Sequence, residues 1–136
     1  SARLRVGDII LDNIKPDFNK ALNIIFKFAW SKQANMVQVG LAKRLMREIG
    51  SEVVYGDFYA CNNFDVRDKV QEIQVPTLVI SGSDDQMTPA KFGRALAQAI
   101  PKAKFVELYR VGHFMMQEEP ERVAAAIRRY VLDTFT

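Results

Sequence analysis

Cysteine and histidine are almost absent from this sequence of 136 residues, which has one of each. Because Cys61 has no second cysteine to pair with, no disulfide can form within the chain, and a CxxC metal motif is excluded. One cysteine and one histidine cannot furnish a tetrahedral metal site without a cluster of carboxylates, so we expect no metal and no cofactor. The scarcity of cysteine fits a protein of the reducing cytoplasm.

Long apolar runs are also lacking. No stretch approaches the roughly 20 residues that a membrane span requires, and Ser1–Arg5 contain no signal-peptide core, so we expect no membrane segment. The 19 basic and 16 acidic residues give a net charge of +3, but the two signs alternate along the chain. Without a basic run or interleaved aromatic residues, we expect no nucleic-acid partner.

Helical periodicity dominates the first half of the sequence, and no strand is predicted there. From Pro16 onward, apolar residues recur at spacings of three and four, as on one buried face of a helix. A second helix is predicted from about Ala34 to Gly50, with a buried apolar row opposite a solvated charged row. The apolar positions are Phe18, Leu22, Ile25, Phe26 and Ala29 in the first helix and Val37, Leu41, Leu45 and Ile49 in the second, whose charged row is Lys43, Arg44, Arg47 and Glu48.

The second half predicts a strand, a helix, a strand and a helix. Residues 75–80 form a continuous apolar, β-branched run, typical of a parallel strand covered on both faces, and residues 104–109 form the next strand. Thr88 and Pro89 suit the N-cap and the first turn of the helix between them, and Pro120 opens the last helix. The expected inward positions are Phe92, Leu96 and Ile100, then Val123, Ile127, Tyr130 and Val131. This order predicts two parallel strands joined by a right-handed crossover.

Two groups with catalytic chemistry follow the predicted strands. Asp84 and Asp85 lie in the turn after the first strand, and His113, the only histidine, lies in the turn after the second. The carboxyl ends of parallel strands open into one crevice, so a carboxylate and the imidazole can meet there. Such a carboxylate fixes the tautomer of the ring and stabilises the imidazolium that forms when the ring takes a proton.

The two turns together resemble the closing segment of α/β-hydrolase-fold enzymes, especially small carboxylesterase-like members. Gly82–Pro89 has the pattern Gly-x-x-Asp-x-x-x-Pro, and Gly112–Pro120 has the pattern Gly-His-x-x-x-x-Glu-x-Pro, within a similarity that covers about residues 65–135. The resemblance implies that Asp85 and His113 are the acid and the base of a catalytic triad. Asp84 and Ser83 are then expected to stabilise the turn. Glu118 and Pro120 match the acidic residue and the proline that open the final helix of the family.

The resemblance also implies the fold class and the domain organisation. The fold class is α/β, the C-terminal portion of an α/β-hydrolase fold, with core residues 65–136 preceded by a helical cap over residues 1–64. Large apolar residues of the cap would partly face a substrate cavity, although packing is the simpler role for any one of them. These residues are Phe26, Phe28, Trp30, Met36 and Met46.

The nucleophile of the family is missing from this sequence. Its Gly-x-Ser-x-Gly elbow and its oxyanion-hole segment precede the acid and the histidine in chain order, and none of the five serines has glycines at that spacing. An acid and a base alone have nothing to activate or to stabilise. We therefore expect a serine-hydrolase fragment that is inactive alone, from a parent that acts on a small ester or acyl substrate. Cys61 is disfavoured as a replacement nucleophile because it follows no elbow.

A second hypothesis treats the chain as a non-catalytic binding or assembly module. Two strands form too narrow a sheet to bury the apolar run of residues 78–80 on both faces. The exposed edge is expected to pair with upstream strands of a missing N-terminal half, or with a second copy of the chain in a homodimer. Haloperoxidases, dehalogenases and C–C hydrolases share the fold, so the fold does not fix the substrate.

Overall fold

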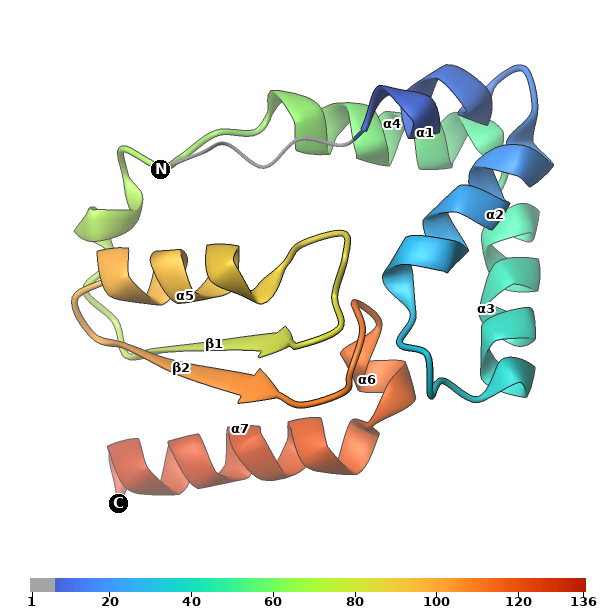
Figure 1. Cartoon of the computed structure of the whole chain (residues 1–136). Coiled ribbons are helices and arrows are strands. Elements are labelled where there is room, and N and C mark those ends of the chain that lie inside the picture. The colour runs from blue at the N-terminus through green and yellow to red at the C-terminus, as the bar shows by residue number, and fades with distance from the viewer. Residues whose placement is uncertain (1–6) are drawn as a thin grey trace.

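A two-stranded parallel sheet forms the centre of the C-terminal half. In the computed structural model, which describes residues 7–136, β1 (Thr77–Gly82) pairs in parallel with β2 (Ala103–Leu108). Helix α5 (Ala90–Ala99) connects the strands, which confirms the predicted strand–helix–strand order (Figure 1). β1 begins two residues later than expected, because Pro76 has no N–H to donate to the ladder.

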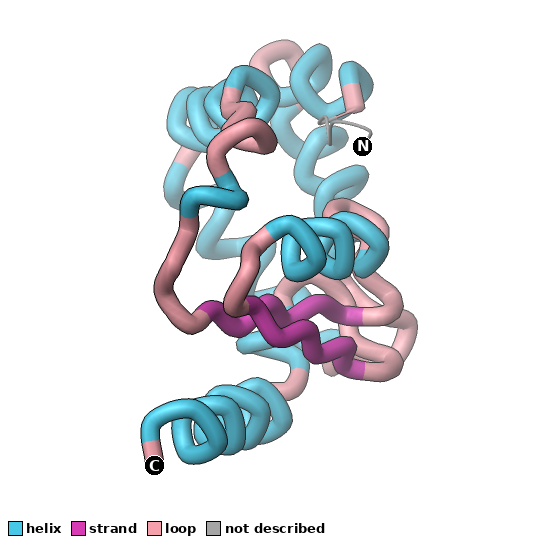
Figure 2. Tube along the Cα trace, turned by 90° about the vertical axis from the view of Figure 1, so that its left-hand side faces the viewer, coloured by secondary structure: helices cyan, strands magenta, loops and turns pink. Residues whose placement is uncertain are grey.

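Helices α5 and α7 cover opposite faces of this sheet, as Figures 1 and 2 show from two directions. Helix α7 (Pro120–Phe135) begins at the predicted proline, whose missing N–H costs nothing in the first turn. Its Val123 is buried together with Leu108 and Val111. The short helix α6 (Met115–Glu118) lies between the end of β2 and α7.

The apolar faces predicted for α5 and α7 are only partly buried. Ile100 is 4% exposed, as expected, but Leu96, Ile127 and Val131 are 39%, 47% and 45% exposed. A sheet of two strands is narrow and covers only part of each helix that packs on it. The prediction that these three residues point into a core is therefore wrong for this chain.

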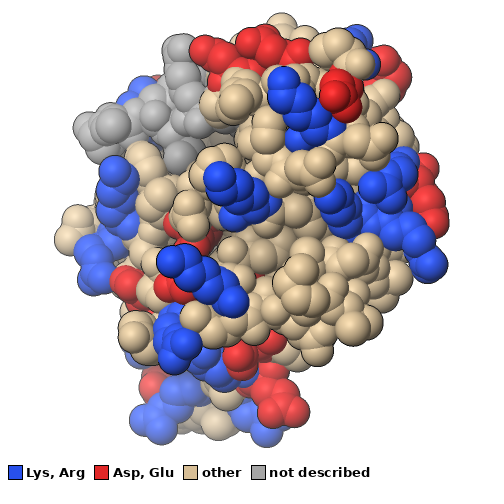
Figure 3. Space-filling view, turned by 45° about the vertical axis from the view of Figure 1, so that its right-hand side comes forward, with Lys and Arg blue, Asp and Glu red and all other residues tan. Residues whose placement is uncertain are grey.

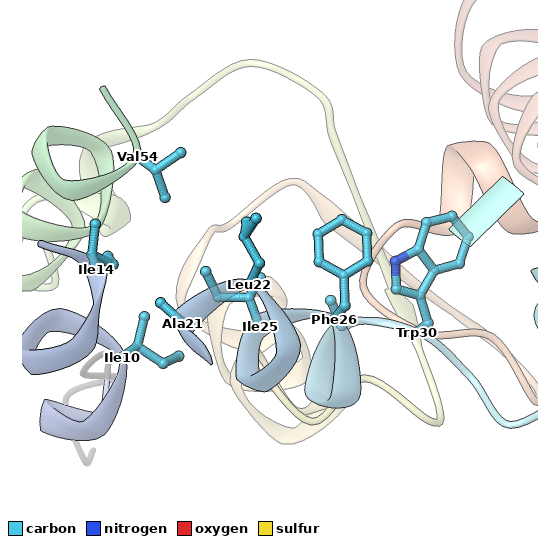
Figure 4. Close-up of a cluster of buried hydrophobic side chains, with 9 residues drawn as sticks. Ile10, Ile14, Ala21, Leu22, Ile25, Phe26, Trp30 and Val54 are labelled. Atoms are coloured by element: carbon cyan, nitrogen blue, oxygen red, sulfur yellow. The ribbon is translucent and has the colours of Figure 1, made fainter. Parts of the chain in front are cut away.

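The helices of residues 8–63 pack on one another to form what we call the helical layer. Its centre is α2, where the predicted positions Leu22, Ile25, Phe26 and Ala29 are all buried. They belong to one buried cluster with Ile10 and Ile14 of α1 and Val54 of α4, most of which Figure 4 labels. The helices of the layer are α1 (Asp8–Ile14), α2 (Phe18–Ala29), α3 (Met36–Ile49) and α4 (Ser51–Asn63). A 3-10 turn, η1 (Val70–Glu72), follows the layer and leads to β1.

Helix α3 turns a different face inward from the one predicted. The row Val37, Leu41, Leu45 and Ile49 is between 48% and 80% exposed, and Figure 3 shows broad uncharged areas between basic side chains on this side of the molecule. The residues that pack inward are Val39, Ala42 and Met46. Arg47 is exposed and Lys43 half-buried, in line with the predicted charged row, and the two side chains donate hydrogen bonds to Asn19 and Asn23 of α2. Because α3 carries two apolar rows of similar length, its periodicity alone does not identify the inward one.

Gly50 ends α3 as predicted, and no described helix spans a membrane. The φ of Gly50 is 94°, in the left-handed region that glycine adopts without strain. Within residues 7–136, no helix combines the length and the apolarity that a bilayer crossing needs. Residues Ser1–Arg5, in which no signal segment was expected, lie outside the described part of the chain.

A glycine-to-alanine pair tests the packing at the end of β1. A Cβ at Gly82 would lie 2.2 Å from the carbonyl oxygen of Val111 and 2.6 Å from that of Gly112. We expect Gly82→Ala to displace the loop that carries His113 and to lower the free energy of unfolding by about 1–3 kcal/mol in urea titrations.

The matched control is Gly40→Ala in α3, where an added Cβ meets nothing within 4 Å. This substitution is expected to raise the free energy of unfolding by up to about 1 kcal/mol, because alanine favours the helix. If Gly82→Ala proved as harmless as Gly40→Ala, the close approach of the two segments would be disproved.

Candidate active site

Asp85 is buried in the turn after β1, with its side chain only 2% exposed. Its Oδ1 accepts the backbone N–H groups of Met87 and Thr88 at 2.9 and 2.8 Å, and its Oδ2 accepts the hydroxyl of Thr88 at 2.7 Å. Thr88 was predicted to cap α5, but the helix begins at Ala90 with no side-chain cap. An ionised carboxylate is a stronger acceptor than a neutral one, so the hydroxyl binds Asp85.

Two opposing effects act on the pKa of Asp85. Burial raises the pKa, because it disfavours the charged form of the carboxyl group. Hydrogen bonds from His113 and Thr88 lower the pKa and outweigh burial, so it lies below the ordinary value of 3.8. Asp85 is therefore ionised at neutral pH, and an ionised carboxylate can only accept hydrogen bonds.

The loop that carries His113 begins with a sharp turn of the backbone after β2. Arg110 has a φ of 60°, in the left-handed region that residues other than glycine seldom adopt. Its N–H donates to Oγ of Ser83 at 2.7 Å, and the hydroxyl of Ser83 donates to Asp84 at 3.0 Å. Ser83 and Asp84 thus stabilise the junction of the two turns, which agrees with the structural role predicted for them.

His113 and Asp85 meet at the strand ends. Nδ1 of His113 lies 2.9 Å from Oδ2 of Asp85 and 3.1 Å from Oγ1 of Thr88. The hydroxyl proton of Thr88 is already donated to Asp85, and the ionised carboxylate has no proton, so Nδ1 carries the proton of the neutral ring. Nε2 is then the basic nitrogen, and it has no hydrogen-bond partner among residues 7–136. The ring is therefore arranged to accept a proton at Nε2.

A cavity of about 590 Å³ opens beside His113, between the helical layer and the strand ends. His113 is 35% exposed while its partner Asp85 is buried, so the ring can reach a bound molecule and the acid cannot. Most of the lining is apolar, which suits an uncharged organic group. The lining residues are Gly7, Ile9, Ile10, Ile25, Phe28, Met46, Asp57, Phe58, Cys61, Gln86, Met87, Thr88, His113 and Phe114.

Two of the five large apolar residues predicted near a substrate cavity line this one. Phe28 and Met46 reach the cavity. Phe26 and Trp30 are instead buried in the core of the helical layer, where their rings stack 6.3 Å apart between centroids. Met36 is 76% exposed on the first turn of α3. Helical periodicity alone did not separate these cases, because core and cavity residues occupy adjoining faces.

Three residues lie in this region at positions that the sequence does not predict. Thr88 contacts both members of the acid–histidine pair. The sequence pattern that could have predicted this contact is an Asp followed three positions later by a hydroxyl residue. Asp57 and the free thiol of Cys61, one helical turn apart on α4, line the cavity. Nevertheless, no group of three or more His, Cys, Asp or Glu side chains in the described residues is placed to hold a metal ion.

Sequence comparison assigns the chain to a family. The model of the alpha/beta hydrolase family matches residues 7–126. This chain belongs to the alpha/beta hydrolase family. It is 26% identical over 123 residues to the AB hydrolase superfamily protein YisY of Bacillus subtilis, covering 90% of this chain and 46% of YisY. It is 32% identical over 117 residues to a 2-hydroxy-6-oxononadienedioate/2-hydroxy-6-oxononatrienedioate hydrolase of Paraburkholderia phymatum, covering 85% of this chain and 39% of that enzyme.

Known structures of the alpha/beta hydrolase fold match nearly the whole chain. A thermophilic esterase gives a TM-score of 0.85 at 26% identity, over 97% of this chain and 53% of the esterase. An esterase from Exiguobacterium antarcticum gives 0.83 at 22% identity, over 92% of this chain and 47% of that one, which supports the fold alone. The predicted α/β-hydrolase fold is confirmed, and the chain spans about half the length of the proteins it matches.

The buried acid predicts a pH-dependent contribution to stability. In Asp85→Asn, the amide nitrogen cannot accept hydrogen bonds from Thr88 or His113, so we expect a loss of about 1–3 kcal/mol at neutral pH. The folded pKa of Asp85 lies below its unfolded value. Its contribution is therefore fully present above about pH 4 and is lost as the pH falls through the folded pKa.

Urea unfolding of both proteins across this pH range measures the effect. The difference between wild type and Asp85→Asn should be constant at neutral pH and shrink below about pH 4. Asp12→Asn, at an exposed position of α1, removes the same charge and should change the free energy of unfolding by no more than about 0.5 kcal/mol. A difference for Asp85→Asn that persists unchanged in acid would contradict an ionised, buried Asp85.

Proposed function

We propose that this chain is part of a serine hydrolase that acts on carboxylic esters or related acyl bonds. In this proposal His113 is the general base and Asp85 orients it. The observation that carries the proposal is the ionised Asp85 on Nδ1 of His113, with Nε2 unengaged beside an apolar cavity. The thermophilic esterase of similar structure, at 26% identity, supports ester chemistry for this chain.

The proposed chemistry needs a nucleophile from outside these residues. A serine hydroxyl supplied by an upstream half would attack the carbonyl carbon of the ester while Nε2 of His113 takes the hydroxyl proton. Asp85 stays ionised and stabilises the imidazolium that forms. The imidazolium then gives the proton to the departing alcohol, and a water molecule releases the acyl group by the same proton transfers in a second step.

We propose that residues 1–64 act as a cap over this site. The cavity lies between the helical layer and the strand ends, so its α2, α3 and α4 walls and the loop of His113 would contact one substrate. Phe28 and Met46 supply apolar surface there, which favours an ester with an uncharged, apolar acyl or alcohol group.

The missing half would cover surfaces that this chain leaves open. The outer edge of β1 has no partner strand among residues 7–136. Leu132 and Phe135 of α7 are 51% and 65% exposed. A half with a further parallel strand would satisfy the edge and bury apolar area together. The same open edge favours the second candidate, a homodimer of this chain that serves as a non-catalytic module.

Ester hydrolysis tests the catalytic proposal. The 136-residue chain alone should hydrolyse short p-nitrophenyl esters no faster than buffer does, because it supplies neither a nucleophile nor oxyanion donors. A polypeptide that joins this chain to an upstream half with a Gly-x-Ser-x-Gly elbow should be active. His113→Ala should lower its kcat by about 10⁴-fold or more, and Asp12→Asn, at an exposed position outside the cavity, should leave kcat unchanged. Full activity of His113→Ala would rule out the proposed base.

Hydrogen exchange separates the missing half from a second copy as the occupant of the β1 edge. The N–H of Thr77 and that of Ser83 donate toward β2, so by strand alternation those of Leu78 and Ile80 point to the outer edge. In the isolated chain we expect fast exchange at Leu78 and Ile80 and slow exchange at Val79. In the joined polypeptide all three should be protected.

A homodimer would give a different pattern. Leu78 and Ile80 would then be protected in the isolated chain, and their protection would increase with protein concentration. Val79 is the internal control, because its amide faces β2 whether or not the outer edge is paired. Concentration-dependent protection at the outer edge would favour the assembly module over the missing half.

A further inference from the structure

Glu118, the last residue of α6, contacts two segments that are far apart in the sequence. Its Oε1 accepts the N–H of Gly112 at 3.1 Å, and both of its carboxylate oxygens lie 3.3 Å from the N–H of Ser31. Ser31 follows the C-terminal end of α2 and is 8% exposed. Among residues 7–136, the carboxylate forms no ion pair with a lysine or an arginine. Its hydrogen-bond partners among residues 7–136 are therefore backbone amides of the histidine loop and of the helical layer.

A second hydrogen bond joins the same two segments. The N–H of His113 donates to the carbonyl oxygen of Ala29 at 2.6 Å. The N–H of Gly112 is thus bound to Glu118, and the N–H of His113 is bound to the end of α2. The position of the His113 backbone is consequently set from outside its own loop.

The histidine loop, the end of α2 and Glu118 pack closely around Gly112. A Cβ at this residue would lie 2.5 Å from Oε1 of Glu118, 2.6 Å from the nitrogen of Ser31 and 2.7 Å from the carbonyl oxygen of Ala29. Only glycine permits such close approach. Loss of the carboxylate would leave two poorly exposed N–H groups without their acceptor, and such groups move to find another partner or water.

We propose that Glu118 is a positioning residue for His113: it ties the loop of the base to the end of α2 and so keeps the imidazole on Asp85. This inference rests on the proposed function, in which His113 is the base. Removal of Glu118 frees the amide of Gly112 and leaves the bond from His113 to Ala29 as the remaining backbone tie. The Nδ1–Oδ2 contact then opens more often, and Nε2 is less often aligned for proton transfer.

NMR of the intact chain tests the proposal directly. His113 is the only histidine, so in protein without a histidine tag its ring signals need no assignment by mutation. The Nδ1–H bound to Asp85 should exchange slowly with water in the wild type. Glu118→Ala should accelerate this exchange by about tenfold, the factor that corresponds to losing one charge-assisted hydrogen bond. Glu118→Gln keeps one acceptor oxygen and should restore part of the protection.

Glu119→Ala is the matched control, because it removes the same charge from the adjacent residue, whose side chain makes no cap hydrogen bond in α7. Its Nδ1–H exchange should equal that of the wild type. If Glu118→Ala does not fold, Glu118→Gln decides: exchange faster than in Glu119→Ala supports the proposal, and equal exchange overturns it. Unchanged exchange in a folded Glu118→Ala also overturns it.

One further variant separates this inference from the proposed function. Asp85→Asn removes the carboxylate partner of Nδ1 and should abolish the slow exchange. If it does not, the acid–histidine pair itself is wrong. If it does while the Glu118 variants behave like wild type, only the positioning role fails. In the joined, active polypeptide, Glu118→Ala should lower kcat by about tenfold to a hundredfold with little change in KM, because misplacement of a catalytic group affects the chemical step.

Discussion

The buried carboxylate of Asp85 constrains much of this structure. An ionised group that is 2% exposed is stable only when donors satisfy its oxygens. Thr88 and Met87 provide three donors from the same turn, and His113 provides the fourth from a loop that follows the other strand. The ends of β1 and β2 must therefore lie side by side, which the parallel register and the absence of a side chain at Gly82 permit.

The helical layer and the histidine loop are joined both by apolar contacts of Phe114 with Phe26 and Trp30 and by hydrogen bonds. The N–H of His113 donates to the carbonyl oxygen of Ala29, and the carboxylate of Glu118 accepts the N–H groups of Ser31 and Gly112 where the segments pack closely around Gly112. Apolar contact alone is non-directional and would allow the two surfaces to slide. The directional bonds fix both the wall of the cavity and the base that faces it.

The sequence predicted the parts of the structure that local patterns determine. The strand–helix–strand order, the places of Asp85 and His113 after the strands, and the buried face of α2 each follow from residues within one turn or one helix. The inward face of α3 was predicted wrongly, because the helix carries two apolar rows and local periodicity does not say which of them contacts the neighbouring helices. The bond between Glu118 and Ser31 spans 87 positions, and no local pattern reports such a contact.

The acid–histidine pair forms without any contribution from a nucleophile. Every donor to Asp85 and both ties on the backbone of the histidine loop come from residues 29–118 of this chain. If a serine-bearing half completes the site, as we propose, that half has to align one hydroxyl with Nε2 and does not have to order the base. Most of the orientation would then exist before the halves meet, and the β1 edge would set the remaining register through regularly spaced backbone bonds. A register error of one residue would turn every side chain of the added strand to the opposite face. Correct pairing at the β1 edge would therefore also be required to place the nucleophile beside Nε2.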